Sequence, residues 1–280
     1  PGWHLECSVM SMKYLGKTID IHGGGLENQF PHHECEIAQS EAANGVQFVR
    51  YWLHNNMVTV DGQKMGKSLN NFITLKQVFS GAHERLTRSY DPMAVRQLVL
   101  NSHYRSPLDF SDAALFAAAS GYEKISRTVM DLRRRYGSAI KGQADNEVIG
   151  QLKQLKERFE SAMNDDLNTA VALSVLFELV RLANSLMEKA NVTVGTLEAV
   201  DGLFKKLGGE VLGIVPEGLT QGSEETYYKL CQTLEILIEQ RNEARKRRDF
   251  AAADAIRDRL DKIGIVLEDK PDRTEWRWKI

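Results

Sequence analysis

The stretch TIDIHGGGLENQFPHHECEIAQSEA, residues 18–42, decides the fold of the first part of this chain. Its start, Thr18–Ile21, is typical of a strand, and this strand should end in a glycine turn at Gly23–Gly25. Pro31 then suits the first turn of a helix, where its missing N–H costs nothing, and the helix should run through Ala42. A strand, a turn and a helix in this order predict an α/β domain.

The rest of the chain changes from this mixed pattern to a helical one. Met57–Val60 predicts another strand, and from Pro92 apolar residues recur at the three- and four-residue spacing of helices. The Pro- and Gly-containing stretch Val215–Glu225 indicates a linker, and beyond it two helices should meet near Asp249, followed by a short tail. We therefore predict a mixed, mostly α fold in three parts: an α/β part at 1–90, a helical bundle at 91–215 and a small helical module at 226–280.

Composition places the chain among ordinary globular proteins. Of its 280 residues, 42% are hydrophobic and 26% are charged, and 36 basic residues face 38 acidic ones. A nucleic-acid-binding role would therefore depend on local basic patches. We see no apolar run near the roughly 20 residues of a membrane span and no signal peptide, so we expect no membrane association. The three distant cysteines argue against a disulfide framework and for a reducing, cytoplasmic setting.

The central part of the opening stretch, FPHHECE, suggests a metal site. On a helix, His32 and Glu36 share one face, and Cys7 is the natural third ligand, because a thiolate favours zinc. His33 lies about 100° around the helix, and Cys35 should point to a different face. The alternative is an exposed helix start with an ordinary His–Glu surface pair. Three ligands also leave tetrahedral zinc one short.

A second motif, Lys64-Met-Gly-Lys-Ser68, suggests phosphate chemistry. Lys64 and Lys67 lie beside Gly62 and Gly66, which predicts a mobile cationic loop. Such a loop can close on a polyphosphate and stabilise the charge that develops on leaving pyrophosphate. Its spacing is not that of a Walker P-loop. The alternative is a plain exposed loop.

Taken in order, these motifs resemble those of the cysteinyl-tRNA synthetase family, a group of class I aminoacyl-tRNA synthetases. The resemblance rests on PGWHLECS (1–8), residues 20–41, KMGKSLNNF (64–72), HYRSPLDFS (103–111), MNDDLNTAVALSVLF (163–177) and ARKRRDFAAADAIRDRLDKIGIVLED (244–269). KMGKS corresponds to the KMSKS signature, with Gly66 in place of serine. The HIGH motif of that class does not occur in this sequence.

The resemblance implies a domain organisation in which one half of the catalytic domain is not part of this sequence. The chain would contain the C-terminal half of a Rossmann-type α/β catalytic domain, a DALR-like helical bundle and an anticodon-binding module. The N-terminal half of the catalytic domain would be a separate part, outside this sequence.

The resemblance also implies one zinc ion per subunit, held by Cys7, His32 and Glu36 and by a cysteine outside this sequence. Zinc prefers a thiolate to a hydroxyl, which would let the site select cysteine over serine without editing. Trp3 would line the same pocket, although a tryptophan of the protein core is the alternative.

For ATP, the resemblance implies contacts from the glycines and the cationic loop. Gly23, Gly24 and Gly25 would let the backbone approach the adenosine, with Glu27 near the ribose or base. A tight structural turn is the alternative explanation of the glycines. Lys67 would contact the phosphates, supported by Lys64, and Mg²⁺ would accompany the nucleotide.

For RNA, the resemblance implies anticodon contacts in the last module, where an aromatic ring can stack on an unpaired base and charged side chains can read its edges. The alternative is a solvated helix with ordinary ion pairs. The residues implied are Arg245, Phe250, Asp254, Arg257 and Asp269.

The function implied is that of a cysteine–tRNA ligase, which uses ATP to form cysteinyl-adenylate and passes cysteine to its tRNA. The expected partners are L-cysteine, ATP, cysteine tRNA and the missing half of the catalytic domain, and we expect a monomer that is inactive as this chain alone. The alternatives are a non-catalytic zinc- and tRNA-binding module and a related ligase that joins cysteine to an amino-sugar. The amino-sugar ligase lacks an anticodon module, so the stretch ARKRRDFAAADAIRD (244–258) argues against it.

Overall fold

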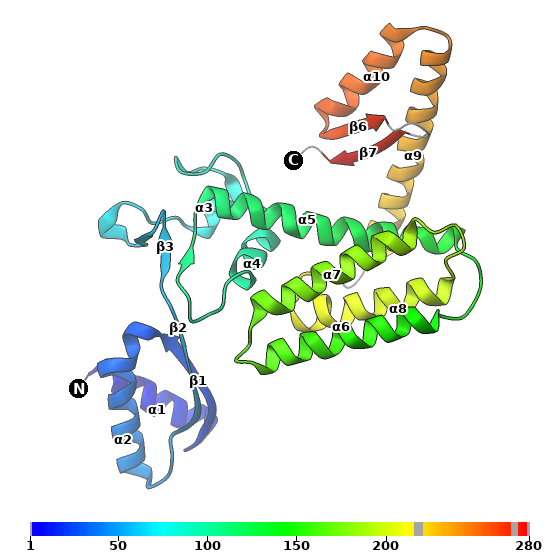
Figure 1. Cartoon of the computed structure of the whole chain (residues 1–280). Helices are drawn as coiled ribbons and strands as arrows, with labels where there is room; N and C mark the ends of the chain where they lie inside the picture. Colours follow the sequence, from blue (N-terminus) through cyan, green and yellow to red (C-terminus); the bar gives the residue numbers. More distant parts are fainter. Residues whose placement is uncertain (1, 216–220, 270–273, 279–280) are drawn as a thin grey trace. The chain divides into compact units, whose positions relative to one another are not determined.

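The computed structural model describes residues 2–215, 221–269 and 274–278 (Figure 1). Its contacts divide the chain into two compact units, Pro1–Pro216 and Glu217–Ile280. The first unit contains an α/β part and a helical bundle, and the second combines two helices with a strand pair. The mixed, mostly α fold predicted from the sequence is confirmed.

A β–α–β arrangement opens the first unit. Its two strands are parallel, so the chain must cross back to the same end between them, and a helix makes this crossing. Helices α1 and α2 pack together on one side of the strand pair (Figure 1). The elements are α1 (Trp3–Leu15), β1 (Ile19–Gly25), α2 (Glu34–Asn44) and β2 (Val49–Asn55).

The predicted turn at the three glycines is wrong. Strand β1 continues through Gly23–Gly25, because β2, for which we made no prediction, pairs with all three of them. The chain turns only afterwards, at Leu26–Asn28 and in an irregular helical turn, Gln29–His33. The predicted helix is confirmed as α2, which ends at the left-handed Gly45.

A small three-stranded sheet follows, in the order β4–β3–β5. Asp61 and Gly62, both with positive φ, form the tight turn between β3 and β4. The apolar core of this part contains Val60, Val78 and Leu98. The elements are β3 (Val58–Val60), β4 (Gln63–Lys64), a short turn at Lys67–Leu69, α3 (Leu75–Ser80), α4 (Pro92–Leu100) and β5 (Leu108–Asp109).

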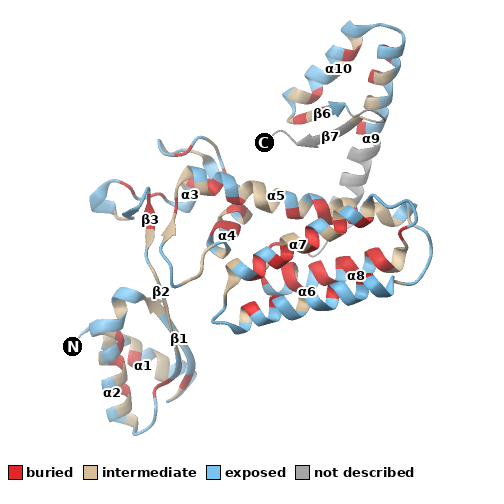
Figure 2. Cartoon of the chain, viewed as in Figure 1, coloured by how far each residue is buried: buried red, intermediate tan, exposed pale blue. Residues whose placement is uncertain are grey.

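Four helices build the bundle, and their buried faces meet in one large core (Figure 2). They begin where the sequence supplies N-cap side chains, Ser111, Asp145, Asn168 and Thr193, each of which accepts a backbone N–H. The helices are α5 (Asp112–Arg135), α6 (Asn146–Asn164), α7 (Thr169–Met187) and α8 (Val194–Phe204), with short helical turns at Tyr136–Ser138 and Lys205–Val211.

Helix α7 differs from the expectation that no segment approaches a membrane span. By length and composition alone, this helix of 19 residues could cross a bilayer. Eight of its side chains are buried in the bundle core, however, among them Leu176 and Leu179. A central core helix needs this apolar composition, which accounts for the pattern.

The second unit contains α9 (Gln221–Lys246), α10 (Phe250–Lys262), β6 (Ile265–Asp269) and β7 (Thr274–Trp278). The two helices meet where predicted, because Asp249 caps α10. The tail that we expected after them forms an antiparallel pair, β6 with β7, whose buried Ile265 and Leu267 pack with Leu260. Residues 216–220 of the predicted linker lie outside the described residues, and α9 begins within that linker at Gln221.

Candidate metal and nucleotide site

The three predicted metal ligands lie together in the first unit. The ligating atoms of Cys7, His32 and Glu36 are all within 4.8 Å of one another. Cys7 comes from α1, His32 from the turn before α2, and Glu36 from the first turn of α2. The indole ring of Trp3 packs on the ring of His32, with 4.4 Å between centroids. Trp3 is 64% exposed, so it borders this cluster and is not a core tryptophan.

The carboxylate of Glu36 is completely buried, and its two oxygens differ. Oε2 lies 2.7 Å from Nε2 of His22 in hydrogen-bond geometry. Oε1 lies 2.7 Å from Nε2 of His32 but accepts no hydrogen bond from the described residues. A buried carboxylate oxygen next to a thiol and an imidazole matches the donor set that binds zinc.

Cys7 is held as a thiol in this arrangement. Burial raises its pKa, and the nearby carboxylates of Glu36 and Glu6 raise it further. A metal ion at the cluster would take the place of the thiol proton, which is how cysteine ligands usually bind. Cys35 is half-buried on α2 and belongs to no group of potential ligands among the described residues.

His33 lies closer to the other potential metal ligands than its position on the helix predicted. It is 4% exposed, and with His22 and Glu36 it forms a second group whose ligating atoms lie within 4.8 Å. Its Nδ1 lies 2.8 Å from Nε2 of His54. Burial lowers the pKa of His33 to about 4, helped by the surrounding His22, His54 and His32, so the ring is neutral near pH 7. Neither His22 nor His54 was predicted, because neither belongs to a motif with ligand spacing.

The predicted nucleotide-binding glycines lie against this histidine cluster. A Cβ on Gly24 would come within 2.6 Å of the ring of His33, and one on Gly25 within 2.5 Å of the carboxylate of Glu27. Glu27 is exposed. Glycine at these two positions therefore leaves room for the side chains of His33 and Glu27, whichever ligand the strand approaches.

Both lysines of the Lys64–Ser68 loop are exposed, and hydrogen bonds to the side chain of Asn71 hold the loop backbone in place. Asn71, 2% exposed, accepts a hydrogen bond from the Gly66 N–H (2.8 Å) and donates one to the Lys64 carbonyl (3.0 Å). The Nζ of Lys67 lies 5.6 Å from the ring centroid of Phe72. No hydrogen bond or ion pair joins either lysine to the Cys7 cluster within the part of the chain that the structure describes.

The turn that precedes this loop has its own anchor. The carboxylate of Asp109, at the end of β5, accepts hydrogen bonds from the Gly62 N–H and the Thr59 hydroxyl, both at 2.9 Å. The bond from Gly62 is the main cause that lowers the pKa of Asp109. Neither Asn71 nor Asp109 was predicted as a site residue, although both lie in motifs that carry the family resemblance, at 64–72 and 103–111.

The five predicted anticodon residues lie in the second unit. Phe250 is 61% exposed at the start of α10, and Asp254 and Arg257 are exposed on the same helix. Asp269 is engaged within the protein: its oxygens accept two hydrogen bonds from Arg241 and one from Arg245, all at 2.8 Å. The Thr274 hydroxyl donates a fourth hydrogen bond (2.9 Å) to this carboxylate.

The Arg241 side chain, 6% exposed, was not predicted. It belongs to the same network, in which it holds Asp269 beside Arg245.

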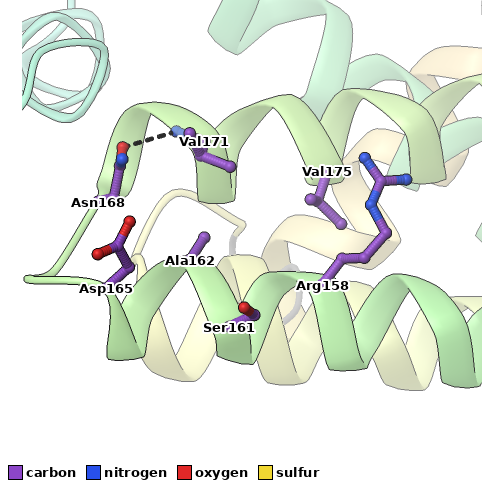
Figure 3. A pocket seen from close by; sticks show the side chains of 7 residues that line it. All are labelled: Arg158, Ser161, Ala162, Asp165, Asn168, Val171 and Val175. Carbon is purple, nitrogen blue, oxygen red and sulfur yellow. Dashed lines mark hydrogen bonds between the residues drawn. The ribbon is translucent and has the colours of Figure 1, made fainter.

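A pocket of about 220 Å³ lies between α6 and α7 (Figure 3). Its lining is polar at one end, where Asn168 caps α7 through the Val171 N–H. Arg158, at the other end, donates two hydrogen bonds of 2.6 and 2.7 Å to the carboxylate of Glu178. The pocket brings together none of the predicted site residues.

Three family models match consecutive regions of the chain. A model of the class I (C) tRNA synthetase catalytic domain matches residues 1–120, and a DALR domain matches 158–216. A cysteinyl-tRNA ligase anticodon binding domain matches 229–277. Part of the chain is also similar to the Agrobacterium radiobacter K84 LeuRS structure, a ternary complex with tRNA and LeuAMS, with a TM-score of 0.50. That similarity covers 71% of this chain and 28% of the other at 18% identity, so it concerns the fold alone.

Among curated relatives, the cysteine–tRNA ligase of Chlorobaculum tepidum is 48% identical over 283 residues, and that of Bacteroides fragilis is 43% identical over 279. These alignments cover 100% and 99% of this chain, but only 55% of each relative, so the chain spans about half their length. Because the similarity extends over the whole chain and the three domain matches follow in the predicted order, the chain belongs to the cysteinyl-tRNA synthetase family.

Proposed function

We propose that this chain is part of an ATP-dependent cysteine–tRNA ligase. In the first step, the carboxylate of cysteine attacks the α-phosphorus of ATP, which yields cysteinyl-adenylate and pyrophosphate. In the second, a hydroxyl of the terminal tRNA ribose attacks the acyl carbon, and AMP leaves. The protein contributes positioning and charge stabilisation to both steps, without a covalent enzyme intermediate.

The cluster of Cys7, His32 and Glu36 is the observation that carries this proposal. Its carboxylate oxygen, thiol sulfur and imidazole nitrogen lie within 4.8 Å of one another, and this donor set suits a single Zn²⁺ ion. Zinc at this point would bind the thiol group of cysteine in preference to the hydroxyl of serine. Trp3, packed on His32, forms the wall of the amino-acid pocket beside the cluster.

ATP would be held by two separated groups of residues. Lys67, supported by Lys64, neutralises the charge on the phosphates and on departing pyrophosphate, with Mg²⁺ as the companion ion. The glycines of β1 and the carboxylate of Glu27 receive the adenosine. The exposure of both lysines and the extended run of three glycines at the end of β1 support these roles.

The second unit would read the tRNA anticodon. Phe250 presents an exposed ring for stacking, while Asp254 and Arg257 offer an acceptor and a donor one helical turn apart. Arg245 is held in place by Asp269, so Asp269 contributes to recognition through the position of that guanidinium.

The parts of the chain divide this work. We assign residues 1–90 to the catalytic domain, 91–215 to the connection and bundle, and 226–280 to anticodon binding. The catalytic part needs its N-terminal counterpart, consistent with the share of the relatives that this chain spans. A translation enzyme of this kind would work in the cytoplasm, and we propose a monomer.

Two measurements on the purified chain test the proposal. We expect it to bind cysteine tRNA and to bind a transcript with a changed first anticodon base more weakly, with both affinities falling as salt rises. We expect no cysteine-dependent ATP–pyrophosphate exchange from the chain alone, and exchange from the full-length protein. Equal binding of the two transcripts would contradict anticodon reading. Exchange by the chain alone would contradict the need for a second half, and no exchange by the full-length protein would leave only a binding module.

A further inference from the structure

The two oxygens of Glu36 point to a task for a histidine outside the ligand set. Oε2 receives the hydrogen bond from His22, while Oε1 lies on the side of Cys7, 2.7 Å from Nε2 of His32. A carboxylate can only accept hydrogen bonds, so His22 must carry its proton on Nε2. The bond therefore occupies one oxygen and leaves the other for a metal ion.

The ring of His22 is fixed by its neighbours. His22 on β1 lies directly opposite Trp52 on β2, and their rings meet edge to face with 4.6 Å between centroids. The rings of His33 and Phe48 lie at 5.1 and 6.1 Å. An imidazole enclosed by three rings has little freedom to rotate, so its N–H is held toward Glu36.

A second metal ion on His22, His33 and Glu36 is the competing explanation. In that group, Nε2 of His22 and Oε2 of Glu36 already pair with each other, and Nδ1 of His33 pairs with His54. A cation would have to break the first of these bonds to enter. The other oxygen, Oε1, lies on the side of Cys7 and His32, which favours one metal ion there, with His22 bonded to the opposite oxygen.

We propose that His22 is a positioning residue for the metal site: its N–H holds Glu36 so that Oε1 alone faces Cys7 and His32. The inference rests on the zinc site proposed above. Such hydrogen bonds to ligating side chains set their orientation, and their loss typically costs about 10–100-fold in metal affinity.

Zinc affinity of the full-length protein, measured by competition with a chromophoric chelator, tests the proposal. His22→Phe keeps a ring against Trp52 but has no donor, and we expect it to bind zinc about 10–100-fold more weakly. His22→Gln retains an N–H donor and should restore affinity to within about threefold, which a purely structural role of the ring would not predict. His54→Phe is the matched control, because His54 does not contact Glu36, and it should bind as the parent does.

The results distinguish the role of His22 from the existence of the zinc site. If the parent binds zinc and His22→Phe binds it equally well, the role of His22 is overturned and the zinc site stands. If the full-length parent, which supplies the fourth expected ligand, binds no zinc, both are overturned. Should thermal unfolding show that His22→Phe has lost its fold, His22→Asn replaces it, because the shorter amide cannot reach Oε2. Parent-like affinity of His22→Asn would then overturn the role.

Discussion

At the scale of single residues, Glu36 organises the candidate metal site. Its buried carboxylate meets side chains from the preceding turn, from α1 and from β1. Burial of an unpaired carboxylate is costly, so this arrangement is stable only with protons or a cation among its partners.

Cys7 and Cys35 should differ in zinc binding. Cys7→Ala removes a ligand whose sulfur lies within 4.8 Å of the other two ligating atoms, so we expect its zinc to be lost. Cys35→Ala should retain the zinc of the parent, because Cys35 belongs to neither ligand group. Elemental analysis of the purified variants measures both. Zinc retained by Cys7→Ala and lost by Cys35→Ala would reverse our assignment.

Lys67 should matter for the chemical step. In the full-length protein, Lys67→Ala should slow adenylate formation by a factor on the order of 10²–10³, the usual result of removing one charge-stabilising donor, with little change in cysteine binding. Pre-steady-state measurement of adenylate shows this directly. Lys76→Ala, an exposed lysine on the nearby α3, is the control and should react normally. An unchanged rate in Lys67→Ala would remove it from the mechanism.

At the scale of elements, the lysine loop is preformed by hydrogen bonds that lie outside its signature. Asp109 fixes the turn between β3 and β4, and Asn71 joins the backbone of Lys64 to that of Gly66. Exposed lysines can thus move while the backbone that carries them keeps its shape. Positioning of this kind lowers the entropy lost when the loop meets its ligand.

Asn71→Ala should loosen this loop. It leaves the Gly66 N–H and the Lys64 carbonyl without a partner, at a cost of about 1–3 kcal/mol for each group that stays buried. We expect faster hydrogen exchange of the Gly66 amide in the chain, detectable by NMR. Asn71→Asp keeps the acceptor and should protect Gly66 better than alanine does. Ser68→Ala, at an exposed position of the same loop, should change nothing, and parent-like exchange in Asn71→Ala would show that the clamp is dispensable.

At the scale of the whole molecule, each of the two compact units has a core of its own. The bundle core is extensive, whereas the described residues of the second unit form a smaller core around Leu234, Leu260 and Ile265, beside the Arg241–Asp269 network. Arg241 is the main cause that lowers the pKa of Asp269, assisted by Thr274 and Arg245. A small unit of this kind should be sensitive to the charge of that carboxylate.

Acid should therefore loosen the second unit. Because folding lowers the pKa of Asp269, the network contributes its full stability above the ordinary aspartate pKa of about 4, and loses it as pH falls toward the folded value. We expect protection factors of the β6 amides, corrected for intrinsic exchange, to decline below about pH 4. Asp269→Asn should show lower protection at neutral pH and little further decline. Equal pH profiles for both proteins would contradict the role of this carboxylate.

The local sequence pattern was enough to predict much of the secondary structure of this protein. The helix after Pro31, the strand at Val58–Val60, the helical bundle and the junction at Asp249 follow from periodicity, proline geometry and capping residues, all of which act over a few residues. The spacing of His32 and Glu36 is local in the same sense. These features needed no knowledge of distant contacts.

Tertiary structure alone decided the surroundings of those residues. Pairing of β1 with β2 turned the glycines into strand and placed His22 opposite Trp52. His22 reaches Glu36 across 14 residues of sequence, and Asp109 reaches Gly62 across 47. No periodicity links such positions, because the register between strands and the packing of helices bring them together only after the chain has folded.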